Sequence, residues 1–131
     1  MIMDRAIKIA KSVLSNMFDV SEIHFEKHLT RRANVNEARR FLVYYLVREC
    51  GVKYSYVKNY VPALTNHATA IHHVKLMVQY MKNEPRTKLM YEKFRATMET
   101  EGHTHLVRDY ERAIVEMETL KIKLLTLKKL V

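Results

Sequence analysis

The sequence predicts an all-α protein, and three observations support this fold class. Gly and Pro occur only twice each in 131 residues, which favours long helices with short connections. Apolar residues make up 48% of the chain, and they recur at helical spacing through most of it. Asn-Gly and Asp-Gly pairs, which favour β-hairpins, do not occur. We expect a helical domain over residues 1–98 and a long amphipathic helix over residues 103–131.

The N-terminal region predicts a long helix followed by a short one. The first spans about residues 3–17 and ends before a short interruption. Ser21 is a favourable N-cap for a short second helix that contains Ile23 and Phe25. The apolar stripe of the first helix consists of Ile7, Ala10, Val13, Leu14 and Met17.

The next helix should be the central and most buried one. Asn34 stands three residues before Glu37, the spacing of a capping box, so we expect the helix to begin there and to reach Cys50. The run from Phe41 to Val47 is apolar on all sides, which is typical of a helix surrounded by protein. Gly51 can adopt the left-handed conformation that ends a helix.

A short helix, a tight turn and a longer helix are predicted over about residues 53–81. The short helix covers Lys53 to Val61, and Pro62 ends it because proline donates no amide hydrogen. The longer helix begins near Asn66 and runs to about Met81. Its expected buried stripe is Ile71, Val74, Val78 and Met81. This layout, after a buried helix, is that of a helix-turn-helix.

Two more helices complete the expected fold. One runs from Arg86 to about Thr97, and Gly102 marks the boundary before the last. The expected inward side chains of the former are Leu89, Tyr91, Phe94 and Met98. The last helix has an a/d pattern: Leu106, Tyr110, Ala113, Met117, Leu120, Leu124, Leu127 and Val131. Residues 106–131 therefore either form a coiled coil with a second copy of the chain, giving a homodimer, or fold back on their own domain.

Positive charge is concentrated in the middle of the chain. The formal net charge is +9, and residues 27–58 contribute eight basic and two acidic side chains. Residues 59–95 contribute six and two, whereas residues 96–131 contribute six of each. A localised basic surface is typical of a site for a polyanion. The alternative is a solvated basic face without a partner.

In a helix-turn-helix the second helix enters the major groove, and its first turns meet the base edges. Asn can pair with adenine, Thr with bases or a thymine methyl, and His can donate or accept. The residues available for this are Thr65, Asn66, His67, Ala68, Thr69, His72 and His73. Residues that could meet phosphates are Arg31, Arg32, Arg39, Arg40, Lys53 and Lys58. The alternative for His67, which lies near the apolar side, is a histidine that covers the edge of the core.

The segment Asn66-His67-Ala68-Thr69-Ala70-Ile71-His72 resembles the signature of the C-terminal DNA-binding domain of the bacterial replication initiator DnaA. That family reads Asp-His-Thr-Thr, an apolar pair and His, so Asn66 and Ala68 are substitutions. The run Tyr45-Leu46-Val47-Arg48-Glu49 is similar to the family's central helix, and Arg40 matches an arginine at the start of that helix. The similarity extends over roughly residues 7–98.

The resemblance implies a fold like that of the tryptophan-repressor group. It also implies that Arg32 reaches the minor groove, while residues 66–69 lie in the major groove. Double-stranded DNA is therefore the expected partner, in the control of replication or of transcription, and a phage or mobile-element origin would suit a stand-alone copy of this domain. The initiator's nucleotide-binding domain has no counterpart, because no Gly-rich phosphate-binding motif is present.

Several other functions are not expected from this sequence. Cys50 is the only cysteine, so no intrachain disulfide can form. No stretch has the length and continuous apolar character of a transmembrane helix or signal peptide, so we expect a cytoplasmic, nucleoid-associated protein. We expect no metal, no cofactor and no catalysis, because no ligand set or acid–base pair is visible. The alternative function is a non-catalytic interaction protein that binds a protein partner through its C-terminal helix.

Overall fold

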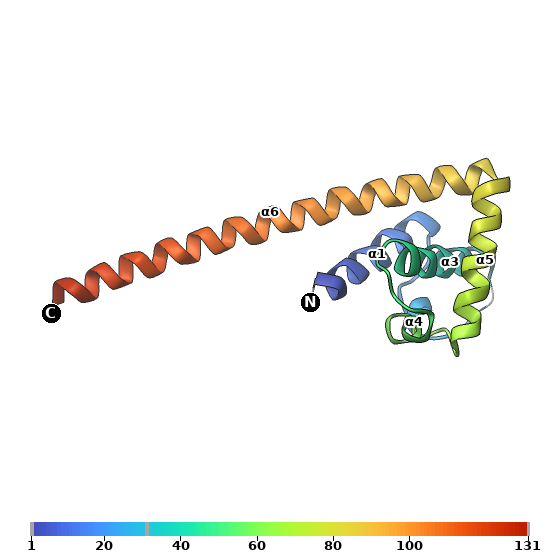
Figure 1. Cartoon of the computed structure of the whole chain (residues 1–131), viewed down its shortest axis with the longest axis horizontal. Helices are drawn as coiled ribbons and strands as arrows, with labels where there is room; N and C mark the ends of the chain where they lie inside the picture. The colour runs from blue at the N-terminus through green and yellow to red at the C-terminus, as the bar shows by residue number, and fades with distance from the viewer. Residues whose placement is uncertain (1, 31, 131) are drawn as a thin grey trace. The chain divides into compact units, whose positions relative to one another are not determined.

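The computed structural model describes the backbone of residues 2–30 and 32–130, and the side chains within these ranges other than 2, 3, 102–109 and 130. Every regular element of the described backbone is a helix, which confirms the all-α prediction (Figure 1). The helices are α1 (Ile2–Phe18), α2 (Ile23–Glu26), α3 (Ala33–Arg48), α4 (Tyr54–Tyr60), α5 (His67–Asn83) and α6 (Pro85–Leu130). Contacts divide the chain into two compact units, Met1–Met98 and Glu99–Val131. None of the described helices is both long enough and apolar enough to cross a membrane.

Helix α3 occupies the centre of the first unit. It contacts α1, α4 and α5. The side chains of Phe41, Leu42, Val43 and Leu46 are buried, as the apolar run predicts. Burial of this run on all sides removes apolar surface from water, which is the main force that stabilises the unit. Helix α3 therefore serves as the support on which the other helices are placed.

The beginning of α3 differs from the sequence prediction. The helix starts at Ala33, with Arg32 at the N-cap position, so Asn34 lies inside the first turn. Its Nδ2 donates to the carbonyl oxygen of Phe18 at 3.4 Å, which ties α3 to the end of α1. The predicted capping box is therefore wrong, because Asn34 is not the N-cap residue and its Oδ1 accepts the N–H of the adjacent Val35 at 3.0 Å. Helix α2 likewise begins after Glu22 instead of Ser21 and has no side-chain cap.

Aromatic rings join the first part of α6 to α3. Tyr91 and Phe94 are buried, as predicted, whereas Leu89 is 69% exposed. Four edge-to-face pairs have centroid separations of 4.9 to 5.8 Å. They are Phe18–Phe41, Phe41–Tyr91, Tyr44–Tyr91 and Tyr45–Phe94. Such rings bury large areas and prefer this geometry, so the last three pairs hold the start of α6 on α3, whereas Phe18–Phe41 joins α1 to α3.

The buried face of α5 is rotated from the predicted one by about one residue. Its buried side chains are Ala70, His73, Val74 and Met77, a regular helical stripe. Of the predicted stripe only Val74 is buried; Ile71 and Met81 are half-buried, and Val78 is 43% exposed. The rotation arises because α5 buries a histidine, which a count of apolar residues places on the outer face.

Helix α6 is continuous across Gly102, so the predicted helix boundary there is wrong. A single glycine inside a helix costs only about 1 kcal/mol relative to alanine, which a helix can tolerate. In contrast, Gly51 follows the end of α3 with φ +71°, the left-handed conformation that the sequence predicts. In the second unit all side chains of residues 110–129 are exposed, whereas the predicted stripe residues Leu106 and Val131 lie outside the described side chains.

Candidate nucleic-acid interface

The connection between α4 and α5 is anchored by buried apolar side chains. Pro62 follows α4, and Val61, Ala63 and Leu64 are buried. The amide of Ala63 donates to the carbonyl oxygen of Phe25 at 3.1 Å, which fixes the connection to α2. Because α4 and α5 also contact each other directly, the start of α5 has a defined position on the first unit.

The leading turn of α5 is exposed. Thr65, Asn66, His67 and Ala68 are all exposed, and Thr69 is half-buried. His67 is therefore not a residue that covers the core edge, which was the alternative for this position. The first amide groups of a helix have no acceptor inside it, so this turn presents donors and polar side chains to solvent.

Asn66 has a structural role at this turn. Its Oδ1 accepts the backbone N–H of Thr69 at 3.1 Å and the hydroxyl of Thr69 at 3.3 Å. This is the N-cap interaction, which satisfies one of the free amides of the helix. Recognition of adenine by an asparagine needs both its oxygen and its nitrogen, and here the cap uses the oxygen.

The basic residues predicted to meet phosphates separate into three groups. Arg32, Lys53 and Lys58 are exposed, and Arg32 and Lys53 occupy the N-cap positions of α3 and α4. Arg40 is half-buried, and its guanidinium lies over the ring of Tyr80 at 4.9 Å from the centroid. Arg31 lies outside the described residues.

Arg39 forms the third group, because it is 2% exposed and cannot meet a phosphate. Its Nε donates to the carbonyl oxygen of His24 at 2.8 Å, and its Nη2 donates to that of Lys27 at 3.2 Å. Burial lowers the pKa of the guanidinium. The residue instead ties the end of α2 to α3. Residue type and charge do not distinguish it from Arg40.

The two adjacent histidines of α5 have different environments. His72 is exposed, whereas His73 is 8% exposed. The prediction that His73 meets a base is therefore corrected, because its ring lies within the protein. Burial, with the positive charges of Arg40, His72 and Arg39, lowers the pKa of His73 to about 4. The ring is consequently neutral at physiological pH.

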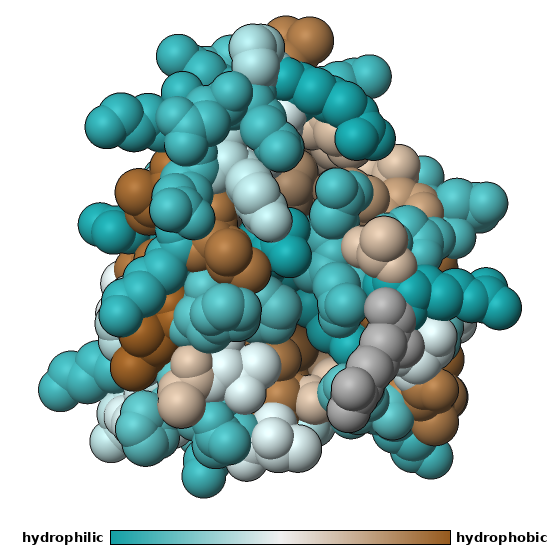
Figure 2. All heavy atoms as spheres, turned by 90° about the vertical axis from the view of Figure 1, so that its right-hand side faces the viewer, coloured by the Kyte–Doolittle hydropathy of each residue, from teal (hydrophilic) through white to brown (hydrophobic). Residues whose placement is uncertain are grey.

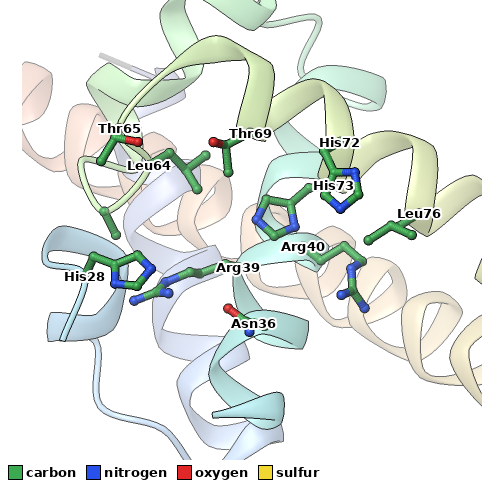
Figure 3. A pocket seen from close by; sticks show the side chains of 11 residues that line it. His28, Asn36, Arg39, Arg40, Leu64, Thr65, Thr69, His72, His73 and Leu76 are labelled. Atoms are coloured by element: carbon green, nitrogen blue, oxygen red, sulfur yellow. The ribbon is translucent and has the colours of Figure 1, made fainter. Parts of the chain in front are cut away.

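A cavity of about 330 Å³ lies between α3 and the start of α5, and we call it the α3–α5 cavity. Figure 3 shows His28, Arg39 and His73 turned toward this space. None of its described lining residues is acidic. They are His28, Asn36, Arg39, Arg40, Ala63, Leu64, Thr65, Thr69, His72, His73 and Leu76. The sequence shows no signal for this cavity, because its walls come from three separate segments.

Hydrophilic side chains cover most of the α5 side of the protein (Figure 2). This side has the polar character that a duplex interface needs, since such interfaces are more polar than those between proteins.

The described part of the chain contains no group of three or more His, Cys, Asp or Glu side chains that could hold a metal ion. Cys50 is half-buried, and burial raises the pKa of its thiol. A thiol with a raised pKa is a poor nucleophile.

The chain was also compared with known proteins. It matches no model of a known protein family, and a search of curated proteins finds no match.

Proposed function

We propose that this protein is a non-catalytic module that binds double-stranded DNA, with α4 and α5 acting as a helix-turn-helix. The single observation that carries the proposal is the exposed, polar leading turn of α5 on a first unit that holds the positive charge of the chain. In this arrangement residues 65–69 face base edges in the major groove. The similarity of residues 66–72 to the DnaA C-terminal domain supports the same reading.

The basic side chains would fix the position of the protein on the duplex. Lys53 is the N-cap residue of α4 and Lys58 lies within α4. In this proposal both would meet the DNA backbone beside the groove that α5 enters. Arg32, at the start of α3, is the residue that the resemblance directs into the minor groove. Phosphate contacts position a protein on DNA, whereas base contacts carry its sequence preference.

His67 and Ala68 are the residues to which we assign base readout. Their side chains are exposed, and no other group in the described structure uses the His67 ring. Thr69 is half-buried, and its hydroxyl is hydrogen-bonded to Asn66. His72 is exposed one helical turn further along α5. We infer a regulatory role in replication or transcription on a nucleoid. In such a role the preference for one DNA sequence matters more than the overall affinity for DNA.

Binding to duplex DNA over a range of salt concentrations tests this proposal. Each phosphate contact contributes a slope of about −0.9 to the logarithm of affinity against the logarithm of salt. Lys58→Gln should therefore reduce the slope by about one contact. Lys8→Gln, an equal loss of charge on α1, is the matched control and should leave the slope unchanged. A slope near zero for the unaltered protein would refute DNA binding.

Selection of bound duplexes from a random pool tests the base readout separately. The unaltered protein should enrich one sequence, and His67→Ala should lose preference at one position by roughly 1–3 kcal/mol while keeping its salt slope. An unchanged preference in His67→Ala would show that the site assignment is wrong even where DNA binding holds.

A second candidate function rests on the apolar stripe of the second unit. Met117, Leu120, Leu124 and Leu127 are each about 60% exposed, although they occupy successive a and d positions. An exposed stripe of this kind is expected to bury itself against a partner. We propose a second copy of the chain as that partner, because the same a and d positions on both helices would form one apolar seam. In a parallel pair Glu116 at position g faces Lys121 at position e of the other helix, whereas Lys123 at g faces Lys128 at e, a like-charged pair that opposes the dimer.

Sedimentation of the full chain tests the dimer. The unaltered protein should sediment as a dimer, and Leu120→Lys should sediment as a monomer because it places a charge in the seam. Thr119→Lys is the matched control, since the neighbouring position c points away from the seam. A monomeric unaltered protein at high concentration would reject the homodimer.

A further inference from the structure

The α3–α5 cavity is lined by hydrogen-bond donors from three segments. Asn36, Arg39 and Arg40 come from α3, and Thr69, His72 and His73 come from α5 (Figure 3). His28 closes a third side from the loop after α2. None of the lining side chains that the structure describes carries a negative charge. A concave site that is lined by donors and has no carboxylate is suited to an anion.

Two buried polar atoms in this lining have no hydrogen-bond partner among the described residues. They are Nδ1 of His73 and Nε of Arg40. The His73 residue is only 8% exposed. Buried polar groups are almost always paired in folded proteins, because leaving one unpaired is destabilising. Both atoms belong to residues that line one cavity. Because neither atom is open to solvent, a ligand in the cavity would pair with them only after a small rotation of each side chain.

We propose that the α3–α5 cavity binds the phosphoryl group of a small phosphorylated molecule. The face of the Arg40 guanidinium lies over Tyr80, so its in-plane N–H groups would be the ones to pair with phosphoryl oxygens. The ring of His73 would donate from Nδ1–H to a third oxygen. The proposal does not rest on DNA binding, since the cavity and its unpartnered groups exist without a duplex.

The number of donors distinguishes a phosphoryl group from a carboxylate. Arg40 can pair with two oxygens at once, and His72 and His73 add donors from α5, so an anion with three terminal oxygens matches this lining better than a carboxylate with two. The three terminal oxygens of a phosphoryl group would meet donors from α3 and from α5. Because burial keeps His73 neutral, its ring can donate without adding a charge of its own.

The size of the cavity distinguishes a small molecule from a DNA phosphate. About 330 Å³ lies within the range of roughly 300–1,000 Å³ that small-molecule pockets occupy. A phosphoryl group fills only part of this space. Ala63, Leu64 and Leu76 supply an apolar wall, against which the rest of a small ligand could pack.

Titration of the full chain with inorganic phosphate tests the proposal without DNA. Imidazole NMR signals report each histidine, and chloride is exchanged for phosphate at constant ionic strength. Millimolar phosphate should shift the signals of His72 and His73 saturably and raise the pKa of His73 by about one unit or more, because an adjacent anion favours the charged ring. His67 and His24, which do not line the cavity, should not respond.

Two variants link this response to the cavity. Arg40→Gln should weaken phosphate binding by about tenfold or more, as expected for loss of a charge-assisted pair. His72→Gln, at an exposed position, should fold normally and lose part of the affinity. Lys88→Gln, an equal loss of charge on α6 outside the cavity, is the control and should bind phosphate as the unaltered protein does. Far-UV circular dichroism and an unchanged His24 signal establish that each variant is folded.

Three further ligands identify the source of the phosphoryl group. A small phosphate monoester should bind more tightly than inorganic phosphate, and acetate should bind more weakly. Equal binding of acetate would overturn the assignment to a phosphoryl group. A response of His73 to duplex DNA but not to inorganic phosphate would overturn the small-molecule ligand. No saturable response, or an equal response of all histidines, would overturn the site itself.

Discussion

Asn66 caps the helix that it precedes: its Oδ1 accepts the backbone N–H of Thr69 at 3.1 Å. The side chain that was predicted to read a base therefore stabilises the element that carries the other candidate residues. Its effect on DNA binding and its effect on folding must be measured separately, because one substitution changes both.

Asn66→Ala should lower the free energy of unfolding by about 1 kcal/mol, since it removes an N-cap acceptor. Asn66→Asp and Asn66→Ser keep an acceptor at this position and should retain most of the stability. Urea unfolding followed by circular dichroism measures the difference. Equal stability of the Ala and Asp variants would show that the cap contributes nothing.

His73 should make the stability of the first unit depend on pH. Its pKa is about 4 in the folded protein, below its ordinary value of 6.5, so the unfolded chain binds the proton more readily. The stability is therefore fully present above about pH 6.5 and is lost as the pH falls toward about 4, by on the order of 3 kcal/mol.

Urea unfolding at a series of pH values checks this. His73→Gln keeps a polar side chain without a titrating ring, so its stability should fall less over the same range than that of the unaltered protein. His67→Gln, at an exposed position, serves as the control. Parallel curves for the unaltered protein and His73→Gln would contradict the prediction.

Arg39→Met should destabilise the first unit by about 1–3 kcal/mol, although methionine fills much of the same space. The cause is that the carbonyl oxygens of His24 and Lys27 lose a charged donor. Arg48→Met, at an exposed position near the end of α3, should change stability by less than about 0.5 kcal/mol. Thermal unfolding of both variants gives the comparison, and equal losses would argue against a buried role for Arg39.

Substitution of the two glycines by alanine should change stability in opposite directions. Gly51 has φ +71° and open space around it, so Gly51→Ala should cost about 1–2 kcal/mol through backbone strain alone. Gly102 lies inside α6, so Gly102→Ala should stabilise the helix by roughly 0.5–1 kcal/mol. Unfolding of the first unit measures the effect of Gly51→Ala, and helix content on heating measures the effect of Gly102→Ala. A loss of helix content in Gly102→Ala would instead support the predicted helix boundary at Gly102.

The sequence by itself determined the helical class of the fold and several of the helix ends. The stop at Pro62, the left-handed Gly51 and the buried run at Phe41 follow from local chemistry: a missing amide hydrogen, a missing side chain and apolar periodicity. These features act within a few residues of the chain, so the tertiary structure leaves them unchanged.

The tertiary structure alone decided which polar side chains are buried. Arg39 and Arg40 are adjacent and of one type, yet only Arg39 meets the free carbonyl oxygens at the end of α2. His73 is buried and His72 is exposed for a similar reason, because α5 packs on α3 with its face rotated by one residue. Burial of a polar group depends on hydrogen-bond partners from distant segments, and the local sequence does not indicate which segments these are.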